Sequence, residues 1–168
     1  MRLPKPIINF TSGSRPLELL ICGGKSESDY PWAKRFIGGW PIPNWQRSLV
    51  WAQEQKVAFI DSVYRGYDLG SVMINEPEWN SSETQMLAMS DAVIDGQQRL
   101  SAIIGFVNNE FPVNGLHWKD LTRLEQRIFR EREIGFKSTK CYDEGKLKIV
   151  YNHLNFSGVR HLAREMAR

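Results

Sequence analysis

The junction around Gly96 constrains the fold more than any other part of the sequence. Before it, Ala92-Val93-Ile94 is a short apolar run of the kind found in buried strands. After it, apolar side chains recur at i, i+3, i+4 and i+7, at Leu100, Ile103, Ile104 and Val107. That spacing predicts a helix with one face in the core. The chain is therefore expected to pass from a buried strand into a helix through one tight turn.

Two further elements precede this junction. Apolar residues at helical spacing predict a helix over Gln53–Arg65, and Gly66 stands where a helix commonly ends. Ser71–Asn75 is short and apolar enough for a second strand. Glu76–Ser90 contains a proline and a polar tip, so we expect a surface excursion there. We expect a small α+β domain.

A charged helix is expected after the junction. Asp120 or Thr122 can cap it, and Glu125 lies at capping-box spacing from Thr122. The helix should run to about Arg132. Its alternating charges are typical of a solvated helix face.

The two ends of the chain show weaker patterns. Residues 1–16 show no period and are expected to form an arm or loop. Ile134–Tyr142 and Lys146–Asn152 flank Asp143-Glu144-Gly145, which predicts a hairpin. The tail from Leu154 to Arg168 is expected to be helical again after Gly158.

The bulk composition points to one intracellular domain. A chain of 168 residues with 42% hydrophobic residues can bury a real core. No run approaches the roughly 20 apolar residues of a membrane span, and no secretory signal is visible, so we expect no membrane partner and a cytoplasmic location. Cys22 and Cys141 have no partner at metal-ligand spacing and are expected to be buried thiols. The net charge of +3 is compatible with a polyanionic partner.

Four polar residues crowd the junction, and capping explains only two of them. Asp95 is a favoured N-cap, Gln98 stands at the reciprocal capping-box position, and Gly96 allows a sharp turn. Gln97 and Arg99 remain unexplained. Arg99 also places a positive charge in the first helical turn, where the helix dipole disfavours cations.

A bound anion would account for this arginine. Backbone N–H groups, the positive end of the helix dipole and a guanidinium group together form a phosphate site. Beside such a site, Asp95 could hold a divalent metal ion or orient a water for attack on phosphorus, while the amides position the phosphate or a base edge. The spacing alone leaves capping and phosphate binding both open.

Two motifs carry a family resemblance. Ile94-Asp95-Gly96-Gln97-Gln98-Arg99 resembles the signature of the DGQQR domain in the S half of GmrSD-type, modification-dependent restriction enzymes and related phage-defence proteins. The segment 43–51, PNWQRSLVW, is similar to the family's P-x-x-Q-R-x-x-V-W stretch, and the segment 55–71 to the helix and turn that follow it. Residues 155–158 match a later L-N-x-G element only in part. The resemblance covers Leu17–Gly158.

The resemblance implies a single compact ParB/sulfiredoxin-like domain with a small mixed sheet flanked by helices. We accordingly expect an N-terminal arm (1–16), the domain itself (17–158) and a C-terminal helix or tail (159–168). The implied ligand is a nucleoside triphosphate or DNA, with hydrolysis or nicking supported by Mg²⁺ or Mn²⁺. Carried over by position, the catalytic residues are Asp95, Gln98 and Arg99, the phosphate-binding residues are Gln46, Arg47, Gly96 and Gln97, and the metal ligand is Asp95.

Two other functions stay open at this point. The domain could be a non-catalytic binding module, or a phage-encoded regulator or decoy, that acts on DNA or on a host defence protein. Larger relatives carry a nuclease half of the His-Asn-His type, so a separate nuclease is a possible partner. Alternatively, the polar residues at the junction merely tie the helix start to Gln46 and Arg47.

Other chemistry-bearing residues give weaker signals. His117, His153 and His161 show no metal-ligand spacing. Gly24-Lys25-Ser26 resembles the end of a P-loop, but the opening glycine of that motif falls on Leu19. Four tryptophans lie around the Gln46-Arg47 motif, and they suit either base stacking or core packing: Trp32, Trp40, Trp45 and Trp51.

Overall fold

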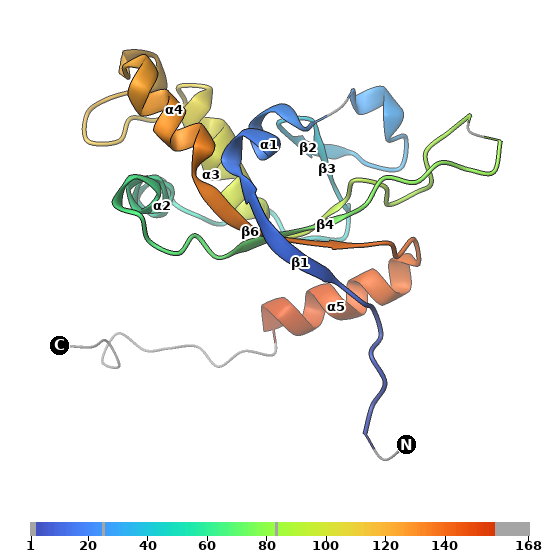
Figure 1. Cartoon of the computed structure of the whole chain (residues 1–168). Coiled ribbons are helices and arrows are strands. Elements are labelled where there is room, and N and C mark those ends of the chain that lie inside the picture. The colour runs from blue at the N-terminus through green and yellow to red at the C-terminus, as the bar shows by residue number, and fades with distance from the viewer. Residues whose placement is uncertain (1–2, 25, 83, 157–168) are drawn as a thin grey trace.

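The protein is organised around a four-stranded mixed sheet, seen here in a computed structural model that describes residues 3–24, 26–82 and 84–156. The strand order is β1-β6-β4-β5 (Figure 1). β6 pairs antiparallel with β1 and parallel with β4, and β4 pairs antiparallel with β5. The strands are β1 (Thr11–Pro16), β4 (Ser71–Asn75), β5 (Val93–Asp95) and β6 (Glu133–Thr139).

Helices cover both faces of this sheet (Figure 1). On one side lie α1 (Leu17–Cys22), α2 (Gln53–Arg65), α3 (Gln97–Val107) and α4 (Arg123–Glu131), and on the other lies α5 (Glu144–Phe156). A separate hairpin of β2 (Arg35–Ile37) and β3 (Trp40–Ile42) packs near α3. The fold is α+β, as the sequence predicted. None of the helices within the described ranges is long and apolar enough to cross a membrane.

Strands β4 and β5 have apolar residues at successive positions because both of their faces are buried. In β4, Val72 and Ile74 join the core beneath α1–α4, whereas Met73 joins a second core beneath α5. In β5, Val93 and Ile94 divide between the two cores in the same way. Successive side chains of a strand point to opposite faces, so a sheet covered on both sides has apolar residues at every position.

Several sequence predictions are confirmed. The helix over residues 53–65 has the expected bounds and ends at Gly66, which adopts φ 80°. The strand over residues 71–75 is present. Thr122 caps α4: its hydroxyl accepts from the Glu125 N–H at 3.3 Å, and the Glu125 carboxylate accepts from the Thr122 N–H at 2.8 Å. That pair is the capping box that the spacing predicted.

The expected hairpin around residues 143–145 is wrong, because the second half of it is helix α5. The Asp143 carboxylate accepts from the Lys146 N–H at 3.2 Å, so the polar run starts a helix instead of closing a turn. Leu147 and Tyr151 are buried and stand four residues apart, which is helical spacing. The predicted helix beyond Gly158 lies outside the described residues.

Two other expectations are corrected. Part of the predicted arm, Thr11–Pro16, forms edge strand β1 with every residue exposed. A strand exposed on both faces has no hydrophobic alternation, so its sequence pattern is that of a loop. Both cysteines are free thiols, but Cys22 is exposed and Cys141 only partly buried. Helix α1 buries Leu17 and Leu20, and this turns Cys22 to its outer face.

Candidate functional site

The candidate site begins where β5 meets α3. Asp95 ends the strand, and Gly96 turns the chain with φ 96° and ψ 11°. A Cβ atom on Gly96 would lie 3.1 Å from the Cα of Val72 in the neighbouring strand. Both the left-handed backbone and this close approach therefore require glycine.

The predicted capping of α3 by Asp95 is wrong. Gly96 occupies the N-cap position, and no side chain of the described residues caps the helix. Asp95 instead lies beside Arg99, with 3.8 Å between carboxylate Oδ2 and guanidinium Nη1. The start of α3 thus keeps its backbone N–H groups uncapped by side chains, and the glutamine that should complete the capping box is used elsewhere.

The two glutamines of the first turn tie α3 to the segment that carries the other polar motif. The Gln98 Oε1 atom accepts from the backbone N–H groups of Val50 and Trp51, both at 3.2 Å. The Gln97 Nε2 atom donates to the Arg47 carbonyl at 3.0 Å. The proposed structural tie between the two motifs is therefore present for these two side chains.

Gln46 makes the matching connection from the other motif. Its Nε2 atom donates to the carbonyls of Val93 at 2.6 Å and Ile94 at 3.1 Å, directly before Asp95. Gln46 as a whole residue is 4% exposed, and Gln98 is 8% exposed. In both residues the remaining amide atom, Gln46 Oε1 and Gln98 Nε2, is buried without a hydrogen-bond partner in the part of the chain described.

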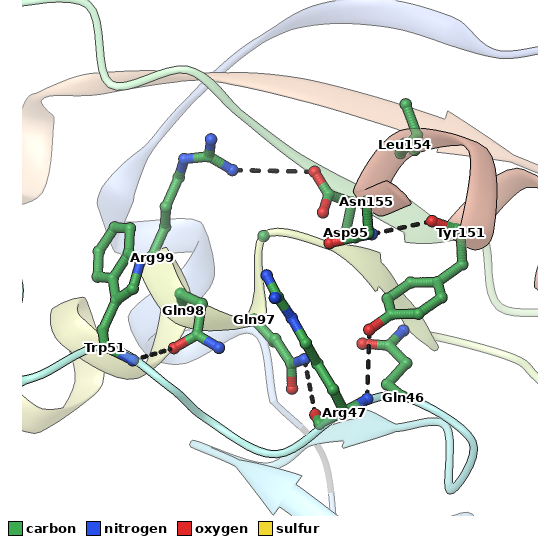
Figure 2. A pocket seen from close by; sticks show the side chains of 11 residues that line it. Gln46, Arg47, Trp51, Asp95, Gln97, Gln98, Arg99, Tyr151, Leu154 and Asn155 are labelled. Carbon is green, nitrogen blue, oxygen red and sulfur yellow. Dashed lines mark hydrogen bonds and ion pairs between the residues drawn. The ribbon is translucent and has the colours of Figure 1, made fainter. Parts of the chain in front are cut away.

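The two arginines differ in how they are held. The Arg99 Nη1 atom donates to the Ser71 carbonyl at 3.1 Å. Its guanidinium group lies over Gly70, where a Cβ atom would come within 3.1 Å of Nη2. The Arg47 guanidinium has no hydrogen bond or ion pair among the described residues, and Figure 2 shows it extending into the space between Gln97 and Tyr151.

These side chains line one pocket of about 240 Å³ (Figure 2). Its lining residues are Gln46, Arg47, Trp51, Asp95, Gly96, Gln97, Gln98, Arg99, Tyr151, Leu154 and Asn155. The structure thus brings together every site residue that the sequence suggested, although about fifty positions separate the two motifs.

Helix α5 supplies the part of the pocket that sequence reasoning missed. Tyr151, Leu154 and Asn155 lie at i, i+3 and i+4, so one face of α5 borders the pocket. The Tyr151 hydroxyl accepts from the Arg47 N–H at 3.2 Å and helps to hold that residue in place. The helical spacing of these three residues could have predicted the helix, but the run Asp143-Glu144-Gly145 before them was interpreted as a turn.

Comparison with known families identifies the chain. The model of the GmrSD restriction endonuclease, N-terminal domain, matches residues 33–165. The chain belongs to this family. The matched range contains both polar motifs of the GmrSD-type domain and the α5 residues that close its pocket. Neither the curated proteins nor the solved structures contain a match.

Most of the tryptophans named in the sequence analysis pack in the core and do not line the pocket. Trp40 is buried and its Nε1 atom donates to the Leu20 carbonyl at 2.8 Å, while Trp32 and Trp45 pack in the core beneath α5. Trp51 alone of the four lines the pocket. Within the described ranges no three His, Cys, Asp or Glu side chains form a metal-binding group. Lys25 and His161 lie outside these ranges.

Proposed function

We propose that this GmrSD-type domain binds a nucleotide or DNA phosphate at the start of α3 and cleaves a phosphoanhydride or phosphodiester bond there. The observation that carries the proposal is the Gln98 side chain, which lines the pocket at the start of α3 and whose buried Nε2 donor has no hydrogen-bond partner among the described residues. A helix N-terminus attracts anions through its N–H groups and dipole. A second, buried donor at the same place supports an anionic ligand.

The arginines fit this ligand. The Arg47 guanidinium extends into the pocket and has no partner in the part of the chain that the structure describes. A planar guanidinium can bind two phosphate oxygens at once. Arg99 is held by Ser71 and lies beside Asp95, so it is suited to stabilising the charge that develops during cleavage. Gln97 holds the carbonyl of Arg47 and so orients its backbone.

Asp95 is suited to the role of metal ligand or general base. Among the described lining residues it alone bears a carboxylate, and its side chain is 32% exposed. Mg²⁺ is commonly held by one or two carboxylates together with substrate phosphates, so a single carboxylate fits Mg²⁺ or Mn²⁺ bound jointly with the substrate. Such an ion would neutralise phosphate charge when bound.

The sheet with helices on both faces also supports our proposal of a ParB/sulfiredoxin-like fold for this DGQQR-type domain.

Direct turnover measurements test the proposal. The purified chain is incubated with Mg²⁺ or Mn²⁺ and, separately, with each nucleoside triphosphate and with supercoiled plasmid. We expect release of phosphate or nicking that is abolished by Asp95→Asn and Arg99→Ala and by chelation of the metal. Arg127→Ala, at an exposed position of α4, is the control and should leave turnover unchanged. Turnover that survives Asp95→Asn would overturn the assignment of Asp95.

One observation favours a second function, a non-catalytic binding module. The pocket has two arginines and several amides but a single carboxylate, which suits binding better than proton transfer. In that case phosphate or DNA binds, the binding is lost in Arg47→Ala, and no turnover occurs under any of these conditions. The same assays, with binding measured beside turnover, decide between the two functions.

A further inference from the structure

The orientation of the Gln46 amide group is determined by its surroundings. Its Nε2 atom donates to two backbone carbonyls, of Val93 and Ile94. Exchanging the amide oxygen and nitrogen would place Oε1 against both carbonyl oxygens, which is unfavourable. The buried Oε1 atom is therefore an acceptor that faces no protein donor among the described residues.

Gln98 has the opposite arrangement. Two backbone N–H groups hold its Oε1 atom, so its Nε2 atom is the unpaired one. Both residues line the pocket, so its wall contains one buried donor and one buried acceptor without a partner among the described residues. Phosphate oxygens of a diester or anhydride only accept hydrogen bonds, so they can satisfy Gln98 Nε2 but not Gln46 Oε1. The acceptor needs a ligand group that carries a hydrogen.

We propose that Gln46 Oε1 accepts a hydrogen bond from the water that attacks phosphorus; this inference rests on the proposed function. The carbonyls that hold Gln46 belong to Val93 and Ile94, so its amide group lies beside the strand end that carries Asp95. Gln46 therefore orients the water next to the carboxylate that removes its proton. A positioning glutamine of this kind is known in other phosphoryl-transfer sites.

The step balances without a further reactant. The water oxygen forms a bond to phosphorus, and the bond between phosphorus and the leaving oxygen breaks, with its electron pair staying on that oxygen. One water proton passes to the Asp95 carboxylate, while the other remains hydrogen bonded to Gln46 Oε1. The products are a phosphate group that carries the water oxygen and the leaving alcohol or phosphate, whose oxygen takes up the proton that Asp95 received.

A crystal structure with a trapped substrate tests the placement of this water. Crystals are grown with Mg²⁺ and the β,γ-imido analogues of ATP and of GTP. We expect a phosphate at the start of α3 and an ordered water about 2.6–3.2 Å from Gln46 Oε1. A bound phosphate with Oε1 contacting a sugar hydroxyl or base amine, or no water, would overturn the inference. A pocket without bound phosphate would overturn the proposed function itself, and this inference with it.

Gln46→Lys tests the role in turnover, because lysine keeps a donor for the two carbonyls but removes the acceptor. We expect kcat to fall roughly 10- to 100-fold while KM does not rise. The matched control is Gln126→Lys, since Gln126 Nε2 also donates to a backbone carbonyl, that of Trp118, but in α4 away from the pocket. Retained kcat would overturn the inference, as would a loss confined to KM. If Gln46→Lys fails to fold, as shown by its melting curve, the ordered water of the wild-type crystal structure decides.

Discussion

Replacing Gln98 by glutamate separates the two tasks of this side chain. A glutamate carboxylate can still accept from the Val50 and Trp51 N–H groups, so the tie to the neighbouring loop is retained. The unpaired Nε2 donor, however, becomes a second carboxylate oxygen. At the position where the wild-type residue offers a hydrogen to phosphate, the variant presents negative charge.

The expected loss of affinity follows from that exchange. A hydrogen bond to a charged group contributes about 1.5–3 kcal/mol. With about 1.4 kcal/mol for each tenfold change in affinity, Gln98→Glu should weaken phosphate binding by roughly 10- to 150-fold. Repulsion between the carboxylate and the phosphate adds to this loss. The free energy of unfolding is measured beside the affinity, because the contacts with Val50 and Trp51 remain while a carboxylate at this buried position costs desolvation free energy.

Calorimetric titration with inorganic pyrophosphate at pH 8, beside thermal unfolding, measures both quantities. Gln85→Glu is the charge-matched control, because Gln85 is exposed and far from the pocket. It should bind pyrophosphate as the wild type does. Wild-type affinity in Gln98→Glu would refute the reasoning, since it would mean that the buried Nε2 atom does not meet the anion.

Three further predictions concern backbone, charge and core. Gly96→Ala should lower the free energy of unfolding by about 1–3 kcal/mol and the Tm by roughly 2–12 °C. Gly115→Ala is the control, because Gly115 also has a positive φ but has open space where its Cβ atom would lie. An equal loss of stability in Gly115→Ala would contradict the role of the close approach at Gly96. Arg47→Lys should weaken pyrophosphate binding at least about fivefold by calorimetry, because lysine lacks the planar fork, and unchanged affinity would argue against two-oxygen binding. Tyr30→Phe removes the 2.8 Å hydrogen bond to buried Asp91 and should lower the free energy of unfolding, measured by chemical denaturation, by about 1.5–3 kcal/mol. A smaller loss would mean that other contacts satisfy Asp91.

Local patterns in the sequence predicted several of the elements that bury one or both faces. The helix over residues 53–65, the strand over residues 71–75 and the Thr122 cap all depend on neighbours within a few positions. The errors arose where local and distant effects compete. Edge strand β1 has no buried face to give it a period, and its pairing with β6 is a contact across more than a hundred residues. The start of α5 has the composition of a turn but serves as a helix start.

The sequence by itself determined the polar residues of the two motifs: a glycine that permits the turn, two arginines, three glutamines and one carboxylate. Only the tertiary structure decided how they act. It joined the two motifs through Gln46 and Gln98, left one acceptor and one donor without a partner among the described residues, and placed one face of α5 along the pocket. The physical reason is that hydrophobic periodicity reports which face of an element is buried. The orientation of a buried amide depends instead on backbone groups that the fold brings from some fifty positions away.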